Sequence, residues 1–172
     1  MTSQHRAAPF VVNGWSIFAH PLFLEQLEAL IIQVEALRRN DPLGCARKNA
    51  TQRLAAIAKL VFESIPRDPT AAQFRQGDSL GPNHKHWYRA KFFMQYRLFF
   101  RFHLESRLIA LGWVNDEETK RADGAKDNAY RIFSKMLAAG RPPDDWDGLL
   151  RECHLACART TQMKELLVDT LK

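Results

Sequence analysis

The stretch "NHKHWYRAKFFMQYRLFFRFH", residues 83–103, decides the fold because apolar side chains alternate in it with basic and aromatic ones. Successive side chains of a strand point to opposite faces of a sheet. Residues 95–104 form the clearest predicted strand, with Tyr96, Leu98, Phe100 and Phe102 on one face and Arg97, Phe99, Arg101 and His103 on the other. With further candidate strands at 84–93 and 107–115, the very short connections predict a consecutive antiparallel meander.

Helices are predicted on both sides of this meander in the sequence. A short strand over 14–20 precedes Pro21, which can open a helix over 21–39 with apolar residues at helical spacing. A second helix is predicted over 45–65. Residues 66–82 hold three prolines and two glycines, which predicts a loop with a short strand near Phe74.

The chain after the meander is predicted to be helical. One helix carries Ile132 and Phe133 and stops at Gly140, and a last helix begins near Asp144 and runs almost to the end. The sequence therefore predicts an α+β fold in one domain, 1–172. Two N-terminal helices pack on one face of a mostly antiparallel sheet, and C-terminal helices follow.

Composition limits the classes of function. The 172 residues are 46% apolar, which is enough for one domain with a sizeable core, and the net charge of +6 favours an acidic partner. No apolar run approaches the ~18 residues of a membrane span, and no secretory signal is visible, so the cytoplasm is expected. Three cysteines form no disulfide framework. Cys153, His154 and Cys157 lack a second ligand pair, so no metal and no cofactor are predicted.

The segment 83–107 is strongly basic, with six lysines and arginines against the single acid Glu105. If strand 95–104 turns back beside strand 84–93, Arg97 and Arg101 join Arg89 and Lys91 on one face. Two interpretations stay open. The face is either an ordinary solvated surface or a phosphate-binding surface, on which arginine forks hold phosphate and aromatic rings stack on unpaired bases.

Five segments, in order, carry a family resemblance: "VNGWSIFAHPLF", "HWYRAKFF", "YRLFFRF", "LGWVNDEET" and "AYRIFSKMLAAGRPPDDW". They resemble the YhaV toxins of the RelE/ParE-like superfamily over about residues 12–152. The C-terminal helical extension, about 153–172, lies outside that pattern. The resemblance implies a RelE-like sheet and helices, in agreement with the fold predicted from the residues.

The resemblance also implies a function. A protein of this family is expected to be a ribosome-associated endoribonuclease that cleaves mRNA and halts translation. It is expected to be neutralised by a cognate AbrB-like antitoxin of the PrlF type, and to reach operator DNA only through that antitoxin. No membrane partner is implied.

RelE-type toxins show a W-K-x-K element followed by a Tyr-Arg pair, which match Trp87, Arg89 and Lys91, and then Tyr96 and Arg97. Because Arg89 is too basic to accept a proton, the base role moves to Lys91 or a histidine, and Lys91 is expected to be the base if its cationic neighbours disfavour its charged form. In RNA cleavage by attack of the 2′-hydroxyl on its own phosphodiester, Arg97 is expected to stabilise the pentavalent phosphorane. Arg89 is expected to hold the phosphate as a second positive group. His84 or His86 could replace Lys91, although His86 is predicted on the opposite strand face.

Further candidates carry weaker signals. The predicted RNA-binding residues are His84, Lys85, His86, Arg101, Arg121 and Tyr130. Tyr130 is the distant candidate for the base-stacking tyrosine that the resemblance implies. Asp116 is either an additional catalytic group or a cap of the following turn. For Trp87 and Trp113, packing in the core or at its rim is favoured over stacking on a base, and Tyr96 is predicted to lie in the core. A non-catalytic RNA-binding or ribosome-binding module would use the same cations.

Overall fold

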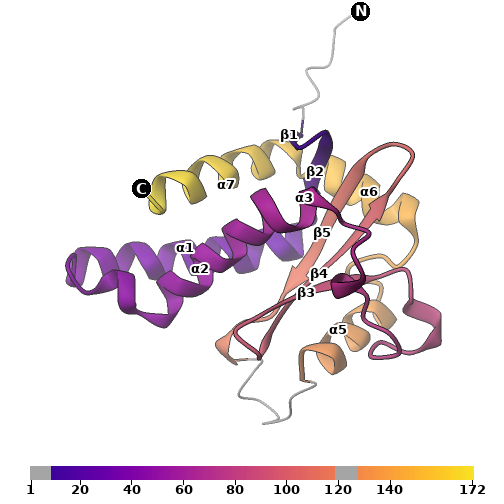
Figure 1. Ribbon diagram of the computed structural model, residues 1–172, viewed down its shortest axis with the longest axis horizontal. Helices are drawn as coiled ribbons and strands as arrows, with labels where there is room; N and C mark the ends of the chain where they lie inside the picture. Colours follow the sequence, from indigo (N-terminus) through magenta and orange to yellow (C-terminus); the bar gives the residue numbers. More distant parts are fainter. Residues whose placement is uncertain (1–8, 119–127) are drawn as a thin grey trace, which may run out of the picture.

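The computed structural model describes residues 9–118 and 128–172 and has an α+β architecture (Figure 1). A five-stranded mixed sheet with the order β1-β2-β5-β4-β3 lies between two layers of helices. Three of its four strand pairings are antiparallel, and β2 runs parallel to β5. The predicted α+β class and mostly antiparallel sheet are confirmed.

The N-terminal hairpin joins β1 (Phe10–Val12) to β2 (Trp15–Ala19). Its two-residue turn, Asn13-Gly14, has positive φ at both positions, 51° and 81°, which is the geometry that favours this dipeptide in tight hairpins. The sequence predicted β2 but missed β1. The parallel pairing of β2 with β5 brings the N-terminal hairpin into the same sheet as the meander.

The meander is present as β3 (Tyr88–Phe92), β4 (Tyr96–His103) and β5 (Leu108–Val114). β3 begins at Tyr88, four residues later than predicted, because residues 82–84 form a short 3-10 turn. Alternation therefore does not extend to His86, and the prediction that placed it on the opposite face is wrong. The strand predicted near Phe74 is also wrong, since a 3-10 turn there leads to a single bridge between Arg75 and Tyr88.

The two predicted N-terminal helices are confirmed and cover one face of the sheet. α1 spans Pro21–Asn40, and α2 spans Asn49–Lys59 and continues through a π-helical turn into α3 (Ile65–Arg67). Their buried side chains share one core with the inward residues of the strands, namely Leu27, Ile31, Val34, Leu54, Ile57, Val61, Tyr96, Leu98 and Phe100.

The C-terminal segment forms two helices where one was predicted. α6 (Trp146–Leu155) and α7 (Cys157–Thr170) are separated at Ala156. α7 returns to the α1 side of the sheet, where Arg159 pairs with Glu28 at 3.0 Å and Met163 and Leu167 join the core (Figure 1). The extension beyond the family resemblance therefore adds a third helix to that layer.

The opposite face of the sheet is covered by α5 (Asn128–Ala138) and α6, around a core of aromatic rings. Trp87, Phe99 and Phe133 are fully buried, and the rings of Phe99 and Phe133 stack with centroids 4.2 Å apart. Gly112 leaves the space that Trp87 fills, because a Cβ at residue 112 would lie 2.7 Å from the indole ring. This packing confirms Trp87 as a core residue and fixes the segment that leads into β3. Within the described ranges, no helix is long and apolar enough to cross a membrane.

Candidate functional site

The basic residues share one face of the sheet, as predicted. α5 covers this face, and a buried row of aromatic rings divides the basic residues into two groups. Arg97 and Arg101 are four residues apart on β4, a span of about 13 Å at ~3.3 Å per residue. Phe99 lies between them under Phe133. The expected single cationic face is therefore two separate clusters.

The first cluster consists of Arg89, Arg97 and Tyr130, and we call it the arginine–tyrosine cluster. Nε of Arg89 donates to the Tyr130 hydroxyl at 2.9 Å, and Nε of Arg97 donates to the same oxygen at 3.1 Å. β3 and β4 supply the two arginines, and α5 supplies the tyrosine. The Tyr130 oxygen thus uses both of its lone pairs on guanidinium groups, and its own O–H has no acceptor among the described residues.

Neutral acceptors hold the rest of this cluster. Nη1 of Arg97 donates to the carbonyls of Met94 and Tyr96 at 2.8 and 2.9 Å, and Nη1 of Arg89 donates to the carbonyl of Gln73 at 2.6 Å. Arg97 is only 9% exposed. Among the described residues, neither guanidinium pairs with a carboxylate, and neither Nη2 donates a hydrogen bond.

Two adjacent positive charges with no carboxylate among the described residues are an unusual arrangement when one of them, Arg97, is buried. Buried charges in proteins are normally paired, because an isolated charge loses its hydration without compensation. An anion at the two Nη2 groups would supply the missing partner, and arginine binds phosphate oxygens well. Lys91, the cross-strand partner of Arg97, adds an exposed ammonium group at the same end of the hairpin.

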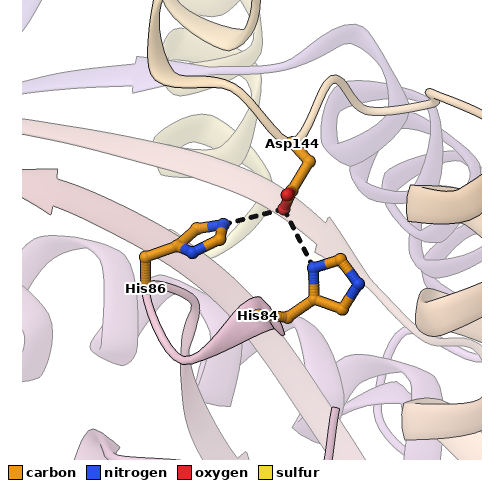
Figure 2. Close-up of side chains that lie close together, drawn as sticks. All are labelled: His84, His86 and Asp144. Atoms are coloured by element: carbon orange, nitrogen blue, oxygen red, sulfur yellow. Dashed lines mark hydrogen bonds and ion pairs between the residues drawn. The ribbon is translucent and has the colours of Figure 1, made fainter. Parts of the chain in front are cut away.

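The second cluster consists of His84, His86 and Asp144, and we call it the histidine–aspartate cluster (Figure 2). Nδ1 of His84 and Nε2 of His86 lie 3.1 and 2.8 Å from Oδ1 of Asp144. The histidines precede β3, and Asp144 lies in the connection between α5 and α6. All three side chains are half-buried, with 24 to 37% of each exposed.

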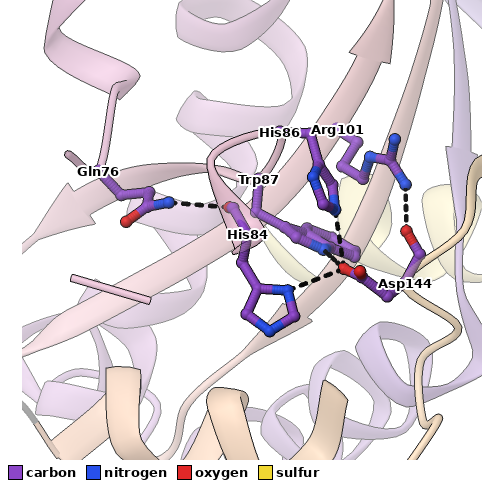
Figure 3. A network of polar contacts seen from close by, with 6 residues as sticks. All are labelled: Gln76, His84, His86, Trp87, Arg101 and Asp144. Carbon is purple, nitrogen blue, oxygen red and sulfur yellow. Dashed lines mark hydrogen bonds and ion pairs between the residues drawn. The ribbon is translucent and has the colours of Figure 1, made fainter. Parts of the chain in front are cut away.

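Further contacts fix the position of Asp144 (Figure 3). Nε1 of the buried Trp87 donates to Oδ1 at 2.9 Å, and Nη1 of Arg101 donates to the Asp144 carbonyl at 2.7 Å. Burial by itself raises the pKa of Asp144, but the hydrogen bonds from His86, Trp87 and His84 outweigh it and leave that pKa below its usual value. The carboxylate is therefore ionised at neutral pH.

Arg101 is held between aromatic rings at this end of the face. Its guanidinium carbon lies 5.6 Å from the Trp87 ring centroid and 5.3 Å from that of Trp146. Burial lowers the pKa of Arg101, while Asp144 and Asp145 oppose that change. Because an arginine remains protonated in proteins, the side chain contributes a fixed positive charge between two rings.

Comparison with known proteins decides the family. The family model described as "Toxin with endonuclease activity, of toxin-antitoxin system" matches residues 17–154, a range that contains both clusters. The chain belongs to the YhaV toxin family. This confirms the resemblance carried by the sequence motifs.

Curated YhaV proteins cover most of the chain. "Ribonuclease toxin YhaV" of Escherichia coli K12 and "Toxin YhaV" of Escherichia coli O6:H1 are each 48% identical to it over 146 residues. That alignment spans 84% of this chain and 95% of each relative. No solved structure matches the chain. All of α7 in this YhaV-family toxin lies beyond the family match.

The structure brings together some of the predicted site residues and separates others. Lys85 pairs with Asp78 at 3.5 Å on the surface, outside both clusters. Asp116 accepts a hydrogen bond from Gln26 of α1, on the other side of the sheet from the clusters. Arg121 lies outside the described residues. Tyr130 is 8% exposed and orients arginines through its hydroxyl, so its ring lies in the core.

Asp144 is the site residue that sequence reasoning missed. It is 58 residues from His86, and only the folded connection after α5 places it beside the histidines. The cysteines carry no comparable site, because Cys153 and Cys157 are buried and burial raises the pKa of both thiols.

Proposed function

We propose that this YhaV-family toxin is a ribonuclease that cleaves mRNA on the ribosome without a metal ion. The observation that carries the proposal is the arginine–tyrosine cluster, where two guanidinium groups converge on one hydroxyl with no carboxylate among the described residues. The K12 relative bears the name of a ribonuclease toxin, which supports RNA as the substrate. Since mRNA is cytoplasmic, the toxin acts in the cytoplasm.

The chemistry is an attack of the ribose 2′-oxygen on its own phosphodiester. Lys91 takes the 2′ proton, the 2′-oxygen bonds to phosphorus, and the bond to the 5′-oxygen breaks. The 5′-oxygen takes up a proton from water as it leaves, so the products are a 2′,3′-cyclic phosphate and a 5′-hydroxyl. His84 or His86 could take this role instead of Lys91, although both imidazoles contact Asp144 in the other cluster.

Charge in the transition state accumulates on the phosphorane oxygens. Among the described residues, Nη2 of Arg97 and Nη2 of Arg89 make no hydrogen bond and can donate to these oxygens, and the Tyr130 O–H supplies a further donor. Arg97 is well suited because three hydrogen bonds fix its guanidinium before substrate binds. Such a fixed donor needs no reorganisation during the reaction.

The partner of the toxin is a cognate antitoxin, as its family implies. We infer that this antitoxin is AbrB-like, of the PrlF type, that it alone contacts operator DNA, and that an acidic segment of it covers the arginine–tyrosine cluster. The net charge of +6 favours such a segment. In the complex, Arg89 and Arg97 should be protected from arginine-modifying reagents. Unchanged modification would point to steric exclusion from the ribosome instead.

The test is cleavage of a defined RNA by the purified chain, alone and with translating ribosomes, in the presence and absence of EDTA. We expect cuts with 2′,3′-cyclic phosphate ends that EDTA does not suppress, and mapped 5′ ends confined to translated regions. Loss of cleavage in EDTA would overturn metal independence. Tight RNA binding without any cleavage would favour the competing interpretation as a non-catalytic binding module.

A further inference from the structure

We propose that His84, His86 and Asp144 form a binding site for a divalent transition-metal ion such as Zn²⁺. The three side chains each offer one ligand atom, and these atoms all lie within 4.8 Å of one another. They come from two segments that are remote in sequence, the turn before β3 and the connection before α6 (Figure 2). This site is separate from the arginine–tyrosine cluster. His84 and His86 enter the proposed RNA chemistry only as alternatives to Lys91, and an ion bound to their ring nitrogens would exclude them from that role.

The donor set fits zinc. Two imidazole nitrogens and one carboxylate oxygen are a common set of three protein ligands for Zn²⁺, with a fourth position left for water. The same set suits Mg²⁺ and Ca²⁺ poorly, because these ions prefer oxygen ligands. In the metal-free arrangement the two nitrogens approach the carboxylate as hydrogen-bond donors. Zinc would replace those two protons and draw the same three groups together.

The residues around the cluster hold the ligands in place, as the outer partners of metal sites do. Nε2 of Gln76 donates to the His84 carbonyl at 2.9 Å, and Gln76 itself is buried. The Trp87 indole donates to the Asp144 carboxylate, and Arg101 holds the Asp144 backbone (Figure 3). Both segments that carry ligands are therefore fixed before any ion binds.

Arg101 is the feature that opposes cation binding. Its charge lies near the site, but its guanidinium contacts the backbone carbonyl of Asp144 and the faces of two tryptophan rings. It does not occupy a ligand position. The positive charge favours an ion that forms strong bonds to imidazole over one that binds by charge alone, which again selects the transition-metal class.

The test is calorimetric titration of the full-length chain with ZnCl₂ in a non-chelating buffer, without RNA, so that the result is independent of the cleavage proposal. We expect one Zn²⁺ per chain and a higher melting temperature in its presence, since an ion that binds only the folded chain stabilises it. An equal titration with MgCl₂ should show no binding. The absence of saturable zinc binding would overturn the site.

Three variants assign the ligands. Asp144→Asn and His86→Gln should each weaken zinc binding by about tenfold or more. His103→Gln is the matched control, because His103 lies on the same sheet face but contacts Ser106 and Trp146 instead. If Asp144→Asn fails to fold, the half-exposed His86 still carries the test. Wild-type affinity in both ligand variants would place the ion elsewhere, and a Co²⁺ spectrum with thiolate charge transfer would place it at a cysteine.

Discussion

The two clusters share one face of one sheet and differ in how their charge is compensated. In the arginine–tyrosine cluster, two guanidinium groups are held by a hydroxyl and by carbonyls. In the histidine–aspartate cluster, an ionised carboxylate already accepts from two imidazoles and an indole. Among the described residues, the first cluster contains no negative charge, and the second contains one. We therefore expect a phosphate to bind most favourably at the first, and we propose the second for a metal cation.

The aromatic row between the clusters keeps them apart and rigid. Phe99 is fully buried and stacks on Phe133, and its ring also meets Tyr130 edge-on at 5.7 Å. Trp87 lies at the other end of this row and donates to Asp144. The same core thus fixes the tyrosine of one cluster and the carboxylate of the other. Changes confined to one cluster should leave the other intact.

The largest effect is expected from Arg97→Ala. Loss of a preorganised donor to the phosphorane should remove ~3 kcal/mol of transition-state stabilisation, roughly a hundredfold or more in cleavage rate. Arg97→Lys should restore little, because lysine keeps the charge but cannot reproduce the fixed guanidinium geometry. The measurement is single-turnover RNA cleavage, with a melting curve, since Arg97 also holds the β3–β4 turn through the Met94 carbonyl.

Arg107→Ala is the matched control for Arg97→Ala. It removes one positive charge from the β4–β5 turn, where the Arg107 guanidinium lies over the Trp15 ring, far from the cluster in sequence and register. Its cleavage rate should stay within about threefold of wild type. Wild-type cleavage by a folded Arg97→Ala variant would remove this arginine from the mechanism. Equal losses of cleavage rate in both variants would mean that Arg97 contributes only its positive charge and not a specific contact.

Sequence reasoning reached the sheet face but not the clusters. Strict alternation in β4 correctly placed Arg97 and Arg101 on the face opposite Tyr96 and Leu98. In a strand that packs on both faces, every second side chain must point to the same face. Alternation gave the wrong faces before Tyr88. Pro82 starts a turn there, and residues outside a paired strand do not alternate between two faces of a sheet. The β1–β2 hairpin was within reach, since Asn13-Gly14 is a strong tight-turn signal.

Contacts between distant segments were beyond any pattern in one sequence. Tyr130 meets Arg89 across 41 residues, and Asp144 meets His86 across 58. Local periodicity predicts that α5 is a helix, but not which turn of it lies over which strand. The arginines proposed to be catalytic could therefore be named from motifs, whereas the groups that orient them required the fold.

The second largest effect is expected from Asp144→Ala, and it concerns stability. The substitution leaves the fully buried Trp87 indole without its acceptor, which typically costs about 1–3 kcal/mol. Asp144→Asn should cost less, because the amide oxygen can still accept from the indole. Chemical denaturation measures both. RNA cleavage per folded molecule should change little, and a hundredfold loss there would show that the two clusters act as one site.

A smaller effect is expected from Tyr130→Phe. The ring still fills the core, but Nε of Arg89 and Nε of Arg97 lose their shared acceptor, and the phosphate loses one donor. One hydrogen bond of this kind is worth about 1 kcal/mol, so cleavage should slow by roughly five- to tenfold. Single-turnover cleavage measures the change. A Tyr130→Phe variant as slow as Arg97→Ala would make the hydroxyl as important for the transition state as Arg97, and an unchanged rate would limit Tyr130 to packing.

The smallest effect is expected from Lys85→Ala, although the sequence placed Lys85 among the RNA-binding residues. Its ammonium group is exposed and pairs with Asp78, and exposed pairs of this kind contribute little to stability. It belongs to neither cluster, so its contact with RNA can only be a general attraction to phosphate. We expect a cleavage rate within about twofold of wild type and an unchanged melting temperature. RNA affinity measured across salt concentrations sharpens the comparison, since removal of one phosphate contact lowers the salt slope by about one. A tenfold loss of cleavage rate at low salt would show that residues beyond the Phe99–Phe133 row take part in cleavage. The conclusion that the two clusters act independently would then be wrong.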